Sequence, residues 1–453
     1  MQFHSFVFLV FAAVFFAAWY GLGDRPRAKQ VLLITASWFF YGFAEWWFLV
    51  PFLLTGTLDY FAGLAMGGDP PRKKLYLALS LGANLGALGF FKYFVFFARS
   101  FESVAGADWV IPNIVLPVGI SFYTFQSMSY TIGVYRGELP PTRDPLTFFS
   151  FLSMWPQFVA GPIERAARLI PQLEKPGRAT SQQQWDGMRL ISLGYFKKTV
   201  VADNCAPIVN AAFASPPPDA GGLFWWAIGL LFAIQIYCDF SGYSDIARGL
   251  AKWMGIDLVV NFNGPYLAES FKDFWNRWHI SLSTWFRDYV YIPLGGRHNA
   301  TRNLWITMLV SGLWHGAAWT FVIWGALHAT YVTLERLTGS DRWLRGLAGN
   351  LVVIAGVTVG WIFFRAETLP LALDVTAQMF SPLSWSVASV AGLGLKPFVL
   401  LGGAILVWLG CRFWKERPVW NEPTLLRQLA LALLLMSAVY LRGPGSTFIY
   451  FQF

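Results

Sequence analysis

Residues 303–334 read NLWITMLVSGLWHGAAWTFVIWGALHATYVTL, and no Asp, Glu, Lys or Arg interrupts them. About 20 such residues suffice for a helix to cross the hydrocarbon core of a bilayer. The same character extends over the whole chain of 453 residues, which is 56% hydrophobic and only 13% charged. Soluble proteins carry about 25% charged residues. The composition therefore predicts a single all-α polytopic membrane domain over residues 1–453, and it excludes a soluble enzyme, a disordered chain and a disulfide scaffold.

The positive charges between the apolar runs predict a topology. The first run, Ser5–Leu22, has no Lys or Arg before it, whereas Arg25, Arg27 and Lys29 follow it. A secretory signal would carry its positive charge in front, and Lys and Arg mark the cytoplasmic side of a span. The N-terminus is therefore expected outside. We expect about 10 to 12 crossings, with re-entrant or interfacial helices besides. The other apolar runs are Val31–Phe43, Trp46–Met66, Leu75–Phe97, Ile111–Val134, Phe148–Ala160, Met188–Phe213, Leu223–Phe240, Leu304–Leu337, Leu351–Phe364, Phe398–Phe413 and Leu425–Leu441.

The net charge of +9 could suggest a nucleic-acid partner, but Lys and Arg lie in short clusters between apolar runs, as in cytoplasmic membrane loops. No nucleic-acid partner is therefore expected. The three cysteines, Cys205, Cys238 and Cys411, are far apart and form no CxxC motif, so we interpret them as buried small residues. The sequence has no HExxH pair, Walker A motif, GxGxxG motif or GxSxG elbow. We expect no metal site.

The segment 239–302 differs from the rest because it is both polar and aromatic. It contains residues 271–283 (FKDFWNRWHISLS), and Gly-Pro and Gly-Gly pairs interrupt it. This pattern predicts short helices joined by turns. Irregular backbone persists at membrane depth only when it is buried in protein or lines a wet cavity, and ionisable residues there mark a candidate functional site.

The five histidines indicate which part of the chain holds the candidate functional site. His315 lies in an apolar helix that is expected to run on through residue 325, and desolvation there keeps an imidazole neutral and able to accept a proton. Gly312 and Gly316 let another helix or a substrate come close beside it. His279, in the polar segment, can meet His315 only across helices. Core packing is the alternative interpretation for both. The remaining histidines are interpreted as an interfacial residue (His4), a solvated residue (His298) and a packed residue bonded to a backbone carbonyl (His328).

Six motifs together resemble one family. Residues 314–316 (WHG), preceded by 278–281 (WHIS) and 285–289 (WFRDY), resemble the membrane-bound O-acyltransferase (MBOAT) family. The chain is similar to the bacterial branch of that family, which includes the membrane subunits of alginate, peptidoglycan and cellulose O-acetylation and the D-alanyl transfer protein of teichoic-acid modification. The resemblance is strongest to the alginate-type subunit. The motifs of the bacterial branch are 158–165 (FVAGPIER), 237–243 (YCDFSGY) and 448–453 (FIYFQF).

The resemblance implies a ring of tilted transmembrane helices in a bacterial cytoplasmic (inner) membrane, with a funnel for the acyl donor. It also implies His315 as the catalytic histidine and His279 as its partner. The resemblance further implies that no cofactor is bound and that acetyl-CoA from the cytosol is the donor substrate. By the same resemblance, the expected acceptor is an extracytoplasmic polysaccharide or a partner protein, and membrane lipid is a further expected partner. Candidate substrate contacts are Asn276, Trp278, Trp314, Arg287 and Asp288.

A hydroxyl acceptor needs a base, and neutral His315 can take its proton. His279 would orient the acceptor or protonate the leaving thiolate, and Asn276 or an indole N–H would stabilise the oxyanion. Cationic side chains such as Arg287 suit either CoA phosphates or lipid headgroups. Alternatives are transfer of D-alanyl or another acyl group to a cell-wall polymer, a transporter, and a non-catalytic scaffold of an exopolysaccharide system.

Overall fold

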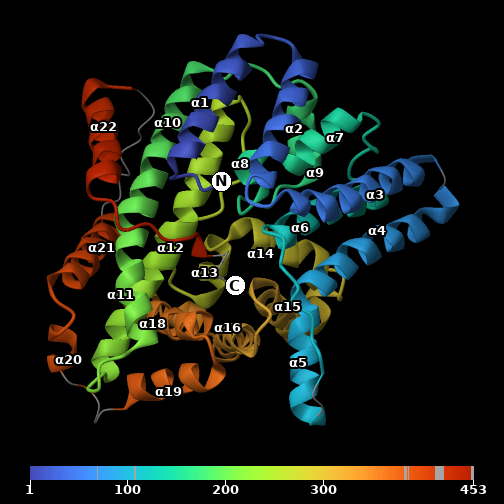
Figure 1. Ribbon diagram of the computed structural model, residues 1–453. Helices are drawn as coiled ribbons and strands as arrows, with labels where there is room; N and C mark the ends of the chain where they lie inside the picture. Colours follow the sequence, from blue (N-terminus) through green and yellow to red (C-terminus); the bar gives the residue numbers. More distant parts are fainter. Residues whose placement is uncertain (69, 107–108, 382–384, 386, 414–422, 450–453) are drawn as a thin grey trace. The chain divides into compact units, whose positions relative to one another are not determined.

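The computed structural model describes residues 1–68, 70–106, 109–381, 385, 387–413 and 423–449. It is 78% helical and has no strand in this part of the chain (Figure 1). The all-α prediction is therefore confirmed. A backbone surrounded by lipid must satisfy its own N–H and C=O groups, and helices achieve this within a single segment.

The α-helices are α1 (Phe6–Gly21), α2 (Pro26–Gly42), α3 (Leu49–Gly68), α4 (Lys73–Leu88), α5 (Phe94–Ala105), α6 (Ile120–Arg136), α7 (Pro145–Ser153), α8 (Trp155–Phe158), α9 (Ala166–Glu174), α10 (Ser181–Tyr195), α11 (Asp203–Ala214), α12 (Gly222–Trp253), α13 (Phe271–Arg277), α14 (Ile280–Phe286), α15 (Ala300–His315), α16 (Trp319–Thr338), α17 (Ser340–Trp343), α18 (Gly346–Arg365), α19 (Leu369–Phe380), α20 (Val387–Ala391), α21 (Leu395–Phe413) and α22 (Leu425–Tyr440). Single π-helical turns occupy Gly89–Tyr93, Phe196–Ala202 and Arg287–Tyr291.

Within the described residues, 5 helical segments are long and apolar enough to cross a membrane: Trp46–Gly68, Lys73–Ala105, Gly222–Trp253, Gly346–Arg365 and Leu395–Phe413. Three apolar helices are shorter: Phe6–Gly21, Leu369–Phe380 and Leu425–Tyr440. These helices agree with a multi-pass membrane protein. The ten to twelve crossings and the ring arrangement stay predictions.

The chain divides into two compact units, and each is described by itself. The first comprises Met1–Ile191 and Tyr243–Val259, and the second comprises Ser192–Gly242 and Val260–Phe453. The expected partition into a single domain stays a prediction. The first unit is built around Trp155 of α8, a fully buried indole. Phe8, Phe11 and Phe15 of α1 pack against this indole with ring centroids 5.2–5.8 Å away.

The same unit buries a carboxylate, Asp59 of α3. Ser80 Oγ–H and Asn84 Nδ2–H of α4 donate to it at 2.6 and 2.7 Å, and Ser127 of α6 is a third donor. Burying a charged or polar group is costly unless it is hydrogen-bonded. These donors therefore explain how α3, α4 and α6 tolerate a carboxylate among apolar residues.

Two expectations about the helices were wrong. The polar stretch that begins at Asp239 continues α12 without a break to Trp253, and the helix ends before Gly255, where φ is +82°. The apolar run 304–337 is two helices and not one. Its helix ends at His315, Gly316 is extended, and α16 starts at Trp319.

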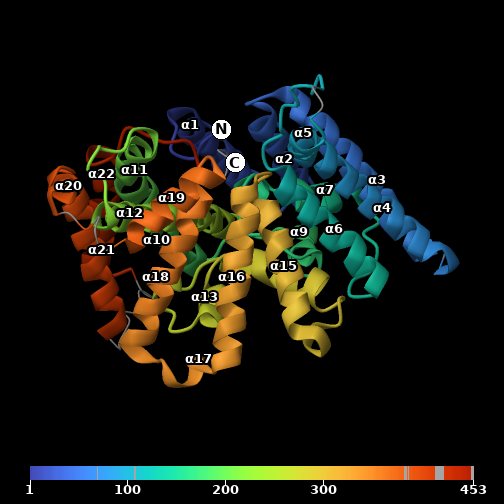
Figure 2. The same ribbon diagram turned by 90° about the horizontal axis from the view of Figure 1, so that it is seen from below.

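The turn brings α15 and α16 side by side as a helical hairpin (Figure 2). A Cβ on Gly312 would collide with the carbonyl oxygen of Phe321, and one on Gly325 would collide with that of Met308. The expectation that another helix comes close beside His315 at Gly312 is thus confirmed. That helix is the next one along the chain, α16.

Candidate active site

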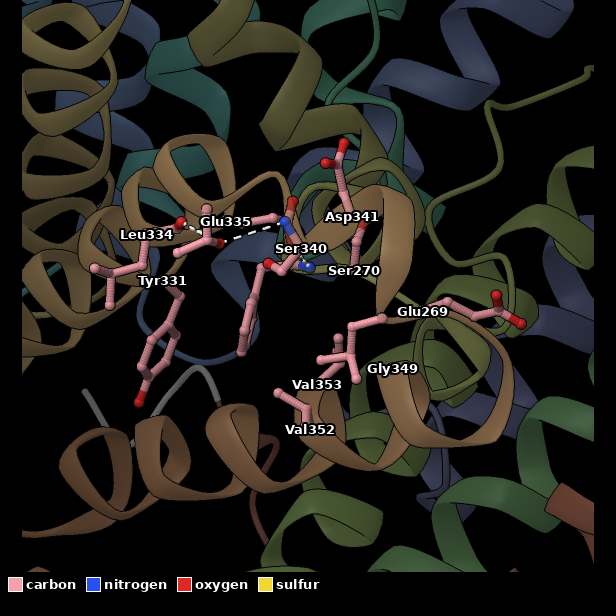
Figure 3. A pocket seen from close by; sticks show the side chains of 13 residues that line it. Glu269, Ser270, Tyr331, Leu334, Glu335, Ser340, Asp341, Gly349, Val352 and Val353 are labelled. Carbon is pink, nitrogen blue, oxygen red and sulfur yellow. Dashed lines mark hydrogen bonds between the residues drawn. The ribbon is translucent and has the colours of Figure 1, made fainter.

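Helix α13 carries polar side chains of the site, and hydrogen bonds from two side chains fix its N-terminus. Ser270 Oγ accepts from the N–H of Asp273 at 3.0 Å. The carboxylate of Glu335 on α16 accepts from the N–H of Phe271 at 2.6 Å (Figure 3) and of Lys272 at 3.2 Å. A carboxylate at a helix N-terminus satisfies unpaired N–H groups and complements the helix dipole. Glu335 therefore ties α13 to α16, beside a cavity of about 190 Å³.

His279 lies between α13 and α14 in a strained conformation. Its φ of +43° is the only positive value of a non-glycine residue among the described residues. Such strain costs on the order of 1–3 kcal/mol and is concentrated at functional sites. Asn261 holds the residue there, because its backbone oxygen accepts from the N–H of Ile280 at 2.9 Å and its Oδ1 lies 3.1 Å from His279 Nδ1.

The same Asn261 oxygen accepts from the N–H of Ser281 at 3.2 Å and from its hydroxyl at 2.9 Å. An oxygen that accepts these bonds requires a proton on His279 Nδ1, so the ring lone pair is on Nε2. His279 is 1% exposed and stands outside the five long apolar helices. Burial lowers its pKa to about 3. The imidazole is therefore neutral at pH 7, with Nε2 able to accept a proton.

His315 approaches His279 from the C-terminus of α15. The two ring centroids are 6.4 Å apart, and His315 is 4% exposed. Trp324 and Phe364 pack edge-on against the His315 ring, with centroids 5.0 and 5.4 Å away. The meeting of the two histidines across helices, expected from the sequence, is present. Aromatic rings surround the pair and exclude water from it.

Trp278 and Trp314 belong to this aromatic shell. The Trp314 ring lies 6.0 Å from His279, and Trp314 is 2% exposed. The Trp278 ring is stacked on Phe274 at 5.6 Å and tilted against Trp361 at 4.9 Å. Trp278 is thus a buried core residue that is adjacent to His279 in the chain.

A cavity of about 390 Å³ lies beside the histidines. Ile280, which follows His279, and Ser311, one turn before His315, both line it, whereas neither imidazole is among its lining residues. Asn276 and Arg287, two of the candidate substrate contacts, also line it, and their contact with a substrate stays a prediction. Its lining residues are Lys272, Trp275, Asn276, Ile280, Leu282, Ser283, Thr284, Phe286, Arg287, Tyr291, Leu304, Thr307, Met308, Ser311, Val332 and Arg336.

The charge of this cavity is one-sided. Its lining includes Lys272, Arg287 and Arg336, and none of its lining residues is Asp or Glu. Asp288, another predicted contact, is not among the lining residues. Its carboxylate lies 2.7 Å from Arg287 Nε and pairs with that guanidinium. The cavity therefore favours an anionic ligand.

Comparison with known proteins places the chain in a family. The model of the membrane-bound O-acyltransferase family (MBOAT) matches residues 136–345. The chain is 38% identical over 447 residues to the probable alginate O-acetylase AlgI of Azotobacter vinelandii. The aligned region covers 93% of this chain and 87% of that relative. The chain belongs to the MBOAT family. This MBOAT chain is accordingly an O-acyltransferase and a multi-pass membrane protein.

Two further relatives widen the range of polymers. The peptidoglycan O-acetyltransferase of Helicobacter pylori is 34% identical over 78% of this chain and 74% of its own length. The teichoic acid D-alanyltransferase of Streptococcus thermophilus is 30% identical over 50% of this chain and 57% of its own length. The relatives of this chain are thus named for the transfer of two different acyl groups, acetyl and D-alanyl.

Sequence reasoning missed some residues that build the MBOAT site. Asn261, which orients His279, lies 18 residues before it, and its only signal was its place in the polar segment. The position of Trp324 against His315 depends on the unexpected turn after α15. Among the described residues, no three His, Cys, Asp or Glu side chains group closely enough to hold a metal ion.

The other singled-out side chains have separate outcomes. His298 is exposed, as expected. His328 is fully buried between Trp275 and Trp324, but its expected bond to a carbonyl was wrong, since neither ring nitrogen has a hydrogen-bond partner in the described part of the chain. Cys205 is buried, whereas Cys411 is exposed on α21, which corrects its interpretation as a core residue.

Proposed function

We propose that this MBOAT chain transfers an acetyl group from acetyl-CoA to a hydroxyl group of an extracytoplasmic polysaccharide. The observation that carries the proposal is the pair of buried histidines, 6.4 Å apart, beside a cavity whose charged lining residues are all cationic. The pair supplies a base, and the cavity suits an anionic donor.

In the proposed reaction, His315 takes the proton of the acceptor hydroxyl as its oxygen attacks the thioester carbon. The new C–O bond forms, the C–S bond breaks, and the proton passes to the departing thiolate. His279 has its lone pair on Nε2, which favours accepting a hydrogen bond from the acceptor hydroxyl over protonating the thiolate. Its part is therefore to orient the acceptor. Asn276 lines the cavity and is the proposed oxyanion donor.

The charges of the cavity bear on the choice of donor. Arg287 and Arg336 present guanidinium groups, which pair with phosphate oxygens in a bidentate manner. A D-alanyl group carries an ammonium, which Lys272 and Arg336 would repel, whereas Arg287 is already paired with Asp288. The neutral acetyl group is therefore favoured over D-alanyl. Membrane lipid headgroups share the phosphate chemistry and are the competing ligand.

The relatives support the acceptor class. The AlgI and peptidoglycan enzymes are named for polysaccharide acetylation, so we assign an alginate-like polysaccharide, or a protein partner that passes the acetyl group on, as the acceptor. The charges after residue 22 support an N-terminus outside a bacterial inner membrane. A cytosolic donor and an external acceptor require transfer across that membrane.

Release of free CoA from acetyl-CoA by the purified protein in detergent tests the proposal, with polysaccharide acceptor present and absent. A general base contributes about 10²- to 10⁴-fold, so His315→Ala is expected to lose at least about 100-fold of the release rate. The exposed His298→Ala is the matched control and keeps the wild-type rate. Equal release by His315→Ala and wild type would refute the catalytic assignment, and a folded protein with no release and no donor binding would favour a transporter or scaffold.

A further inference from the structure

A buried ion cluster in the second unit has no part in the proposed chemistry. Lys198 Nζ lies 2.9 Å from Asp203 Oδ1 and 2.7 Å from Asp239 Oδ1, and all three side chains are at most 6% exposed. Taking such charges out of water is costly, and buried ion clusters are often less stabilising than apolar packing. A cluster that adds little stability calls for another role.

The cluster binds a segment close to the C-terminus. Lys198 Nζ donates to the backbone oxygen and the hydroxyl of Ser446 at 3.0 and 3.2 Å. Asp203 accepts from the N–H of Ser446 at 3.2 Å and from its hydroxyl at 2.6 Å. Asp239 Oδ2 accepts from the N–H of Ile449 at 2.7 Å. Residues 443–449, here called the C-terminal strap, are therefore held by charge-assisted hydrogen bonds.

The start of the strap is fitted just as closely. The N–H of Gly443 donates to the backbone oxygen of Thr199 at 2.8 Å. A Cβ at Gly443 would collide with the backbone of Asp203, so only glycine fits there. The strap leaves α22 and runs beside α12 (Figure 1). Its path is thus set by backbone contacts before Ser446 and by the ion cluster after it.

The strap reaches the active-site histidine through one aromatic ring. Phe448 is 3% exposed, and its ring lies 5.7 Å from that of Phe240. Phe240, fully buried, meets the His279 ring edge-on with centroids 4.7 Å apart. Phe240 directly follows Asp239, the residue that holds Ile449. Two motifs some 210 residues apart therefore meet behind His279.

We propose that the C-terminal strap is a positioning element, in which Phe448 holds Phe240 against His279 and the ion cluster holds Phe448 in place. Asn261 fixes His279 by a hydrogen bond, and Phe240 limits its movement on another side. Phe448 touches no reacting atom in this proposal. Its removal acts on the orientation of the imidazole, and therefore on kcat, while the cationic cavity and the KM for acetyl-CoA are unaffected. The inference rests on the proposed function of His279.

Steady-state CoA release by the full-length chain tests the strap. A misplacement of about 1 Å can cost about 10²-fold in rate, so Phe448→Ala is expected to lower kcat by about 10- to 100-fold, with KM within about twofold. Phe448→Leu refills most of the space and recovers most of kcat. The matched control is Phe224→Ala, a buried phenyl on the same helix as Phe240, sixteen residues and thus about 24 Å away.

The outcomes separate the two proposals. Wild-type kcat in Phe448→Ala, with His279→Ala inactive, overturns the strap and leaves the proposed function standing. The same loss of kcat in Phe224→Ala also overturns it, since the effect is then one of general stability. Wild-type release by both His279→Ala and His315→Ala overturns the proposed function and the strap with it. Should Phe448→Ala fail to fold, Ser446→Ala provides the test, and an unchanged kcat in that variant counts against the strap.

Discussion

Replacing Asn261 by Ala removes the oxygen that orients His279. Asn261 Oδ1 lies 3.1 Å from His279 Nδ1 and accepts from the N–H of Ser281 at 3.2 Å. The Ser281 hydroxyl can rotate to another acceptor, but the two N–H groups cannot. Each buried donor left without an acceptor costs about 1–3 kcal/mol, so the free energy of unfolding is expected to fall by about 2–6 kcal/mol.

The catalytic effect follows from the loss of orientation. The bond from His279 Nδ1–H to Asn261 favours the tautomer with the lone pair on Nε2 by about 1.4 kcal/mol, at the upper end of the net value of a neutral hydrogen bond. Losing it is worth about tenfold in rate, and freedom of the ring adds to this. We expect Asn261→Ala to lower kcat for CoA release by at least about tenfold while the KM for acetyl-CoA stays the same.

The matched control is Asn263→Ala. Asn263 is exposed and only two residues away, and its backbone makes the contacts to Arg277 that remain in the variant. Its thermal unfolding and its kcat are expected to match the wild type. The two variants are compared by CoA release and by thermal unfolding in the same detergent. A folded Asn261→Ala protein with wild-type kcat would refute the role of this hydrogen bond.

Three further predictions test other parts of the second unit. Asn261→Asp keeps the acceptor but places a negative charge beside the His279 ring, which raises the pKa of His279 from about 3. The rate is therefore expected to fall on acidification at a higher pH than in the wild type, which the pH profile of kcat measures. Arg336→Ala removes a cation from the cavity and is expected to raise the KM for acetyl-CoA severalfold at unchanged kcat, and an unchanged KM would contradict phosphate binding there. Gly312→Val overpacks the contact of α15 with α16 and is expected to cost about 1–3 kcal/mol in thermal unfolding, whereas Gly402→Ala, with open space around it, is expected to change little.

Hydropathy predicted most of the helices because lipid leaves the backbone little choice. Apolar runs such as 398–413 and 425–441 became α21 (Leu395–Phe413) and α22 (Leu425–Tyr440), shifted by a few residues at most. The run at 111–134 became α6 only from Ile120 onward, since Pro112, Pro117 and Gly119 precede it and Gly119 has φ +76°. Hydropathy thus predicts helix positions well where a segment has to satisfy its own backbone hydrogen bonds.

The turn after His315 could not be read from hydropathy. Residues 316–318 are small and apolar, so they continue the pattern of the run although they end the helix. The helix ends before Gly316, which is extended and lies so close to the ring of Phe321 that a Cβ would collide. This contact folds α16 back on α15 and places Trp324 against His315. A signal of this kind exists only once both helices are packed.

Asn261 and Lys198 were missed for a related reason, since their partners lie far away in sequence. The sequence shows that a polar residue in an apolar region is unusual. It does not show which group will be the hydrogen-bond partner of that residue. Asn261 hydrogen-bonds the ring of His279, 18 residues later in the chain, and Lys198 hydrogen-bonds the hydroxyl of Ser446, 248 residues later. The family resemblance pointed to the histidines and to the terminal motif. It did not supply the contacts that connect them.

Several of these contacts orient one imidazole, that of His279. The backbone of His279 at φ +43° is strained by about 1–3 kcal/mol, in a conformation that glycine would adopt freely. Asn261 offsets that cost with backbone and side-chain hydrogen bonds, and Phe240 packs against the ring. A glycine here would relieve the strain but remove the ring. The strain is therefore retained for the ring itself, which is the expectation for a side chain that acts on a substrate and not for one that only fills the core.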